Sequence, residues 1–172
     1  GRRRSYILTD KLSGGHFNSQ ADIRPLLESQ LEACGVDYFD FYLMHAQDRT
    51  GFEKYKKCRA YETAFELKRE GKVKHVGLSF HDTAEVLDRI LTEYPEVETV
   101  QIQFNYADYE DASVESRKCY EVARKHNVPI IVMEPVKGGT LANVPAAVKG
   151  LFKANNPDMS VPSWAIRFVA GL

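Results

Sequence analysis

The stretch that decides the fold is GVDYFDFYLMHA, residues 35–46. Its Phe39 to Met44 portion is an almost unbroken apolar run, which is typical of a parallel strand covered on both faces. The run ends at His45, and the carboxyl ends of parallel strands are where α/β proteins bind ligands and carry out chemistry. The stretch therefore predicts a buried parallel strand with a functional residue at its carboxyl end.

Outward from this strand, apolar strands alternate with segments of helical periodicity. Strands are predicted at residues 5–12, 39–45, 73–80, 99–106 and 129–135. Helices are predicted near residues 23–34, 61–70, 86–94 and 115–127, followed by one helix within 140–156 and one from Ser160 onward. Residues 47–57 are predicted to be a polar loop. This alternation indicates an α/β fold with a parallel sheet and right-handed crossovers.

Two architectures satisfy this order of elements. One is an open doubly wound sheet, and the other is part of a (β/α)8 barrel, which needs about 250 residues when complete. An open sheet normally has a glycine-rich phosphate loop after its first strand, but Ser13-Gly14-Gly15 lacks the GxGxxG spacing. Periodicity alone does not choose between them.

The composition excludes several classes of function. The 172 residues carry a net charge of -1, which gives no electrostatic reason to expect nucleic acid or an acidic membrane as a partner. Basic residues are consecutive at Arg2-Arg3-Arg4, which we expect to be a solvated chain start. The three cysteines are far apart, which argues against a zinc site or a disulfide framework and favours a reducing, cytoplasmic compartment. No apolar run approaches the ~20 residues that span a bilayer.

Polar residues stand at the ends of the predicted strands, and in a parallel sheet they would converge on one rim. They are Lys11, His45, Ser79, Gln101 and Glu134. A lysine beside a histidine can hold a carbonyl oxygen and donate a proton to it. Each also has an ordinary structural interpretation: Lys11 as a solvated strand end, His45 as a core histidine, and Gln101 as a packing residue.

Weaker candidates lie elsewhere in the chain. His75 and His81 flank the Ser79 strand without the spacing of metal ligands, so no metal site is predicted. Gly138-Gly139 would let a phosphate approach the backbone, although a simple turn is the more common meaning of two glycines after a strand.

Four stretches taken together resemble the aldo/keto reductase family in order and spacing. They are GVDYFDFYLMH at 35–45, EGKVKHVGLS at 70–79, QIQFNY at 101–106 and MEPVKGG at 133–139. The resemblance covers residues 5–172. It is nearest to the bacterial and archaeal branch that often carries a C-terminal ferredoxin-like iron–sulfur domain, for which GLSFHD at 77–82 and Met133-Glu134-Pro135 are typical.

The resemblance implies a (β/α)8 barrel that reduces a small carbonyl compound with NADPH or NADH and without a metal. Lys11 and His45 match the lysine and histidine of the family's Asp, Tyr, Lys and His tetrad. Ser79 and Gln101 match residues that hold the nicotinamide carboxamide, and Met133 falls where many members stack a tyrosine on the nicotinamide ring. Glu134, in place of a common serine, completes the predicted cofactor set.

The same mapping makes residues 1–172 a single incomplete barrel domain that holds about the third to seventh strands. The Asp and Tyr of the tetrad would lie before the Lys11 strand, so we expect little activity from this fragment by itself. The open edges at residues 5–12 and 129–135 would favour self-association. Two alternatives remain: a non-enzymatic truncated barrel that acts as a binding or regulatory module, and a phosphate-binding domain that uses Gly138-Gly139.

Overall fold

The computed structural model describes residues 2–172 and contains one five-stranded parallel sheet whose strands lie in chain order. The strands are β1 (Thr9–Leu12), β2 (Phe39–Gln47), β3 (Val73–Phe80), β4 (Thr99–Gln103) and β5 (Ile130–Met133). Each connection carries at least one helix, as the alternation of patterns predicts. The strands β1 and β5 form the two open edges of the sheet.

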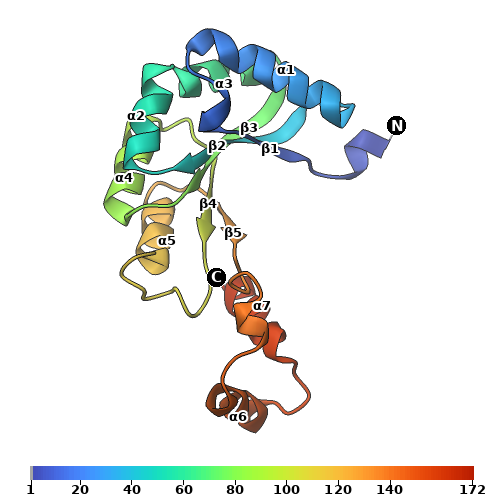
Figure 1. Ribbon diagram of the computed structural model, residues 1–172, viewed down its shortest axis with the longest axis vertical. Helices are drawn as coiled ribbons and strands as arrows, with labels where there is room; N and C mark the ends of the chain where they lie inside the picture. The colour runs from blue at the N-terminus through green and yellow to red at the C-terminus, as the bar shows by residue number, and fades with distance from the viewer. Residues whose placement is uncertain (1) are drawn as a thin grey trace.

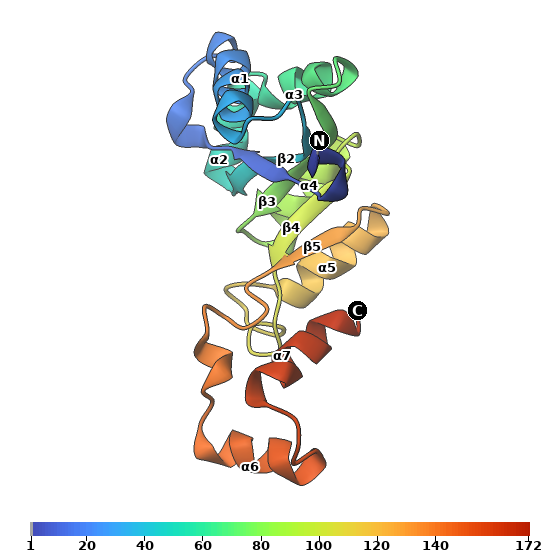
Figure 2. The ribbon, with the colours of Figure 1, turned by 90° about the vertical axis from the view of Figure 1, so that its right-hand side faces the viewer.

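Five helices cover one side of the sheet, and two more extend past its end (Figures 1 and 2). The covering helices are α1 (Ile23–Cys34), α2 (Arg49–Lys57), α3 (Ala60–Arg69), α4 (Ala84–Glu93) and α5 (Ser116–Lys125). The last two are α6 (Ala146–Asn155) and α7 (Val161–Ala170). This arrangement is an arc of a (β/α)8 barrel, in which the helices form the outer layer and the opposite sheet face looks toward the barrel axis.

The main core lies between the sheet and helices α1 to α5. On β4, Val100 and Ile102 are buried in this core, whereas Gln101 and Gln103 alternate with them on the other face. A smaller cluster around Leu141 and Ala165 holds α6 and α7 together. The sheet therefore buries its helix-facing side in apolar packing and leaves its axial side to polar residues.

Helix α2 corrects the prediction that residues 47–57 form a polar loop. Asp48 caps this helix, since its Oδ1 accepts a hydrogen bond from the Gly51 N–H at 2.6 Å. Phe52 and Tyr55, three residues apart, are both buried against the core. The cap and this spacing were present in the sequence, but the four lysines and arginines of residues 47–57 made the segment read as a polar loop.

Three smaller corrections concern element boundaries. β1 begins at Thr9 rather than at residue 5, because Arg2–Ser5 is a 3₁₀ turn. β4 ends at Gln103 instead of continuing to residue 106. The one helix predicted within residues 140–156 is α6, and it begins only at Ala146, after a 3₁₀ turn at Thr140–Ala142 and with Pro145 at its N-cap.

Arg3 is not the solvated residue that was expected at the chain start. Its guanidinium forms an ion pair with Asp40 at 2.8 Å and lies 4.0 Å from the centroid of the Tyr38 ring. The Asp40 carboxylate also accepts hydrogen bonds from the Leu8 N–H and from Lys74 Nζ. These bonds outweigh burial, which by itself would raise the pKa of Asp40, and hold that pKa well below its ordinary value. The cluster closes the amino end of β2.

No helix within residues 2–172 is long and apolar enough to cross a membrane.

Candidate active site

Strand register brings the predicted site residues to one rim on the axial face of the sheet. Lys11 pairs with Leu43 of β2, so His45 lies two residues further along the same face. Ser79 of β3 pairs directly with Gln101 of β4. Met133 of β5 pairs with Gln103, which follows Gln101 on that face. The predicted residues thus follow one another around the carboxyl ends of all five strands.

His45 is held by hydrogen bonds to both its ring and its backbone. Its Nδ1 lies 2.6 Å from the Ser13 hydroxyl. Its carbonyl oxygen accepts hydrogen bonds from the Tyr55 hydroxyl at 3.2 Å and from Gln47 Nε2 at 3.1 Å. The next N–H, at Ala46, donates to the Ser79 hydroxyl oxygen at 2.8 Å. The ring is therefore held from the loop after β1, and the backbone at His45 and Ala46 is held from β2, α2 and β3.

Ser79 and Gln101 place a hydrogen-bond donor and an acceptor side by side on adjacent strands. Ser79 is fully buried, and because its oxygen already accepts the Ala46 N–H, its hydroxyl hydrogen can be donated. The Oε1 atom of Gln101 is buried and has no hydrogen-bond partner within the described residues. One donor and one unsatisfied acceptor on adjacent strands match the carbonyl and NH2 of a primary carboxamide.

Met133 and Glu134 separate at the end of β5. Met133 remains on the axial face, because Ile130 and Val132 pack against the main core on the other side. Glu134 is exposed and has a left-handed backbone with φ of 57°. Its carboxylate lies over its own loop, 3.7 Å from the position that a Cβ on Gly138 would occupy. Met133 therefore lies beside Gln101 and Gln103, whereas the Glu134 side chain points to the loop.

The loop after β5 is fastened to the loop after β4 by a buried carboxylate. Asp108 is fully buried, and its Oδ2 accepts hydrogen bonds from Gln103 Nε2 at 2.6 Å and from Asn105 Nδ2 at 2.7 Å. Its Oδ1 forms an ion pair with Lys137. Asn105 Nδ2 also donates to the Glu134 carbonyl at 3.1 Å. These bonds fix the segment that follows Met133.

The glycines of this loop form turns. The N–H groups of Lys137, Gly139, Thr140 and Leu141 donate to carbonyls within residues 134–137. The Gly139 N–H is therefore occupied by a turn and is not free to bind a phosphate.

The surroundings of His45 favour the neutral form of its imidazole. Burial lowers its pKa, and the positive charges of Lys11 and His81 lower it further. His81 is thus a third basic residue near this rim, which spacing alone did not connect with Lys11 and His45. A hollow of about 550 Å³ beside the free edge of β1 is lined by Lys11, Ser13 and His45, among others.

We expect nuclear magnetic resonance (NMR) titration of the His45 ring to give a midpoint below the ordinary value of about 6.5. Because the folded-state pKa is depressed, the unfolded chain binds the proton more readily, and His45 lowers folding stability as pH falls below about 6.5. Lys11→Met removes one positive charge and should raise the midpoint. A wild-type midpoint above 6.5 would contradict this electrostatic description.

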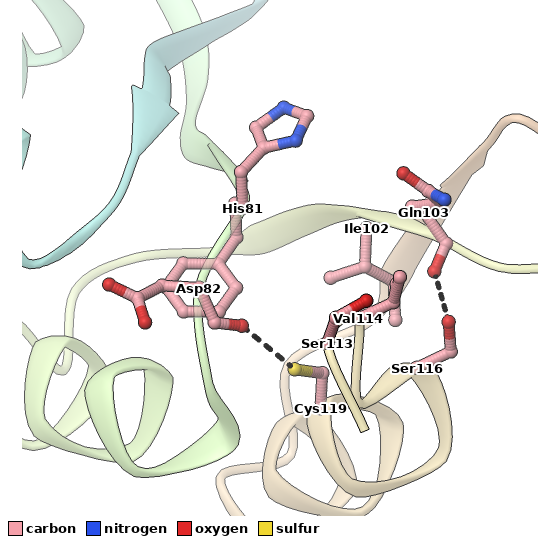
Figure 3. A pocket seen from close by; sticks show the side chains of 9 residues that line it. His81, Asp82, Ile102, Gln103, Ser113, Val114, Ser116 and Cys119 are labelled. Atoms are coloured by element: carbon pink, nitrogen blue, oxygen red, sulfur yellow. Dashed lines mark hydrogen bonds between the residues drawn. The ribbon is translucent and has the colours of Figure 1, made fainter. Parts of the chain in front are cut away.

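A separate small pocket opens between the end of β3 and α5 (Figure 3). Its polar groups are already paired: the Ser116 hydroxyl donates to the Gln103 carbonyl at 2.8 Å, and the Cys119 thiol donates to the Asp82 carbonyl at 3.8 Å. The His81 ring points away from this pocket in the figure. The pocket is therefore a gap in packing beside the rim rather than a second site. Within the described residues, no group of three or more His, Cys, Asp or Glu side chains is placed to hold a metal ion.

The sequence model of the aldo/keto reductase family matches residues 1–169. The chain belongs to the aldo/keto reductase family. This membership confirms the resemblance that the four stretches indicate, and the parallel arc of strands confirms the partial (β/α)8 barrel. A search of curated protein sequences found no match.

Solved aldo/keto reductase structures share the fold of this chain. MGS-M4, an aldo-keto reductase from a Medee basin deep-sea metagenome library, is 23% identical with a TM-score of 0.73, over 98% of this chain and 58% of its own. An aldo/keto reductase from Brucella melitensis gives the same identity and TM-score, over 96% and 58%. One from Klebsiella pneumoniae, in complex with NADP and acetate, is 20% identical with a TM-score of 0.68, over 93% and 54%. The chain thus spans about half the length of these reductases.

Sequence reasoning missed three residues that build this aldo/keto reductase rim. Tyr55 and Gln47 hold the His45 carbonyl, and Ser13 holds its ring. Tyr55 was hidden because its helix was predicted to be a loop. Ser13 lies two residues after Lys11, directly after the end of β1. That position was the available sequence signal that it belongs to the rim.

Proposed function

We propose that this chain supplies the nicotinamide-binding rim and two catalytic residues of an NAD(P)H-dependent reductase that converts a carbonyl into an alcohol. The observation that carries the proposal is the pairing of Ser79 and Gln101 on adjacent strands, with a free hydroxyl hydrogen on one and a buried, unpaired oxygen on the other. An orphaned buried acceptor costs roughly 1–3 kcal/mol unless a ligand satisfies it. Family membership supports the same assignment.

In this proposal Ser79 would donate a hydrogen bond to the carboxamide of NADPH, and Gln101 Oε1 would accept one from it. Met133, on the next strand, covers the nicotinamide ring with an apolar surface. Glu134 would contribute by holding the loop that follows Met133, because its carbonyl accepts a hydrogen bond from Asn105 and its side chain faces that loop. The bound cofactor supplies a hydride to the carbonyl carbon.

Lys11 and His45 act on the carbonyl oxygen of the substrate. A neutral His45 can donate a hydrogen bond from its ring and orient that oxygen. The Lys11 ammonium favours negative charge developing on the same atom and lowers the pKa of a neighbouring proton donor. The resemblance implies that this donor is a tyrosine before the Lys11 strand, and we therefore assign these residues a share of the chemistry rather than the whole of it.

Titration with NADPH, followed by nicotinamide fluorescence, tests this function. We expect saturable binding to the 172-residue chain, weakened about tenfold by Ser79→Ala and by Gln101→Leu because each removes one buried hydrogen bond to the carboxamide. Ser29→Ala, which removes an exposed hydroxyl from α1, is the matched control and should leave affinity unchanged. Equal affinity for all four proteins would refute the assignment of Ser79 and Gln101.

A chain extended at both ends of residues 1–172 that binds NADPH but does not reduce carbonyl compounds would favour the non-enzymatic alternative, a binding or regulatory module. The neighbours crystallised with NADP lead us to prefer NADPH over NADH.

Self-association through the free edges of β1 and β5 is a separate hypothesis that light scattering can test.

A further inference from the structure

The loop after β1 carries a hydroxyl that contacts the imidazole of His45. Ser13 follows the last residue of β1, and its Oγ lies 2.6 Å from His45 Nδ1. The contact joins two segments that are 32 residues apart in the chain and lie on neighbouring strands. The contact is made to Nδ1, which leaves the other ring nitrogen, Nε2, available to face a substrate carbonyl.

The backbone on both sides of this contact is fixed. The Tyr55 hydroxyl donates to the carbonyls of Leu12 and His45, so one buried side chain of α2 ties together the ends of β1 and β2. Lys54, also on α2, donates to the Gly14 carbonyl. A Cβ on Gly14 would lie only 3.2 Å from a ring carbon of Tyr55, so glycine at this position lets the loop pack closely on the helix.

Hydrogen-bond satisfaction within the protein favours one direction of the contact. A serine hydroxyl has one hydrogen, and His45 Nδ1 is the acceptor that the structure offers it. In a neutral imidazole one nitrogen carries the proton and the other accepts. Donation by Ser13 therefore satisfies Nδ1 as the acceptor and leaves the proton on Nε2. The reverse arrangement would leave the hydroxyl hydrogen of a half-buried serine to solvent.

We infer that Ser13 is a positioning residue, which selects the Nε2–H tautomer of His45 and aims that N–H at the substrate's carbonyl oxygen. This inference rests on the proposed function for its consequence, because a carbonyl oxygen needs a donor rather than an acceptor. The tautomer itself is a property of the free chain. It can be measured without cofactor or substrate.

Long-range ¹H–¹⁵N correlation of the His45 ring at pH 8 tests the inference. The wild-type spectrum should show the Nε2–H tautomer. Ser13→Ala should shift the tautomer ratio by about fivefold toward Nδ1–H, which corresponds to one net hydrogen bond. Ser13→Thr keeps a hydroxyl at an extended backbone position and should restore the wild-type ratio. Ser29→Ala is the matched control.

Two results would overturn the inference: a wild-type ring that is mainly Nδ1–H, or a Ser13→Ala ring with an unchanged ratio in a protein whose amide spectrum shows it folded. The wild-type measurement needs no variant, so the test stands even if Ser13→Ala does not fold. Loss of NADPH binding in the separate titration would refute the proposed function and leave the tautomer result intact. The two failures are therefore distinguishable.

Discussion

Gly77→Ala is expected to destabilise the chain by about 3 kcal/mol or more, the upper range for overpacking a dense core. Gly77 lies at the centre of the sheet, between Leu43 of β2 and Thr99 of β4. A Cβ at this position would lie 2.6 Å from the Thr99 carbonyl oxygen and 2.8 Å from Leu43 Cδ2. Because one of these neighbours is backbone in a paired strand, rotamer changes cannot relieve the overlap.

This loss of stability can be measured by urea denaturation, in which Gly77→Ala should unfold at a lower midpoint urea concentration than the wild type. Gly150→Ala is the matched control, because nothing lies within 4 Å of the added methyl group and alanine favours the helix α6. That variant should be neutral or more stable by roughly 0.4–1 kcal/mol. Adding Thr99→Ser to Gly77→Ala removes a crowding methyl and should recover part of the loss. A Gly77→Ala midpoint equal to wild type would contradict the close approach of β3 and β4.

Asp108→Ala is expected to cost roughly 3 kcal/mol, because Lys137, Gln103 and Asn105 would all lose their shared acceptor. For a domain of this size that corresponds to a fall in Tm of roughly 6–12 °C. The free segment after Met133 should also weaken NADPH binding. Asp111→Ala, which removes an exposed carboxylate from the same loop, serves as the control and should stay within about 1 kcal/mol of wild type.

Acid should mimic this substitution. Burial by itself would raise the pKa of Asp108, but hydrogen bonds from Lys137, Gln103 and Asn105 outweigh it and lower the pKa below the ordinary 3.8. The carboxylate therefore stabilises the fold above pH 3.8, and its contribution is lost as pH falls through the lower folded-state value. Asp108→Ala should consequently show less acid dependence of unfolding than wild type. An equal dependence in both proteins would show that the buried cluster does not form.

The predicted order of strands was correct because long apolar runs and helical stripes are local patterns. The alternation at Val100, Gln101 and Ile102 even gave the right faces of β4. The choice of a barrel arc over an open sheet could not come from periodicity, since both share the same order of elements. It came from the resemblance, and family membership confirmed it.

The sequence predicted those site residues that lie at the ends of strands. It was less informative about the residues that hold these side chains in place. Lys11, His45, Ser79 and Gln101 reach one rim because parallel strands align their carboxyl ends. The placement of Tyr55 depends on a helix rich in lysine. Asp108 forms an ion pair with Lys137, 29 residues away, and a single sequence does not reveal such a long-range pair.

The most direct test of the nicotinamide rim is an NMR titration of the folded chain with NADPH, observing the side-chain amide of Gln101 and the methyl group of Met133. Both signals should shift with one common saturation curve, because a carboxamide bound at Ser79 and Gln101 would place the nicotinamide ring beside Met133. Shifts confined to the Gly138-Gly139 loop, with Gln101 and Met133 unmoved at saturation, would contradict it.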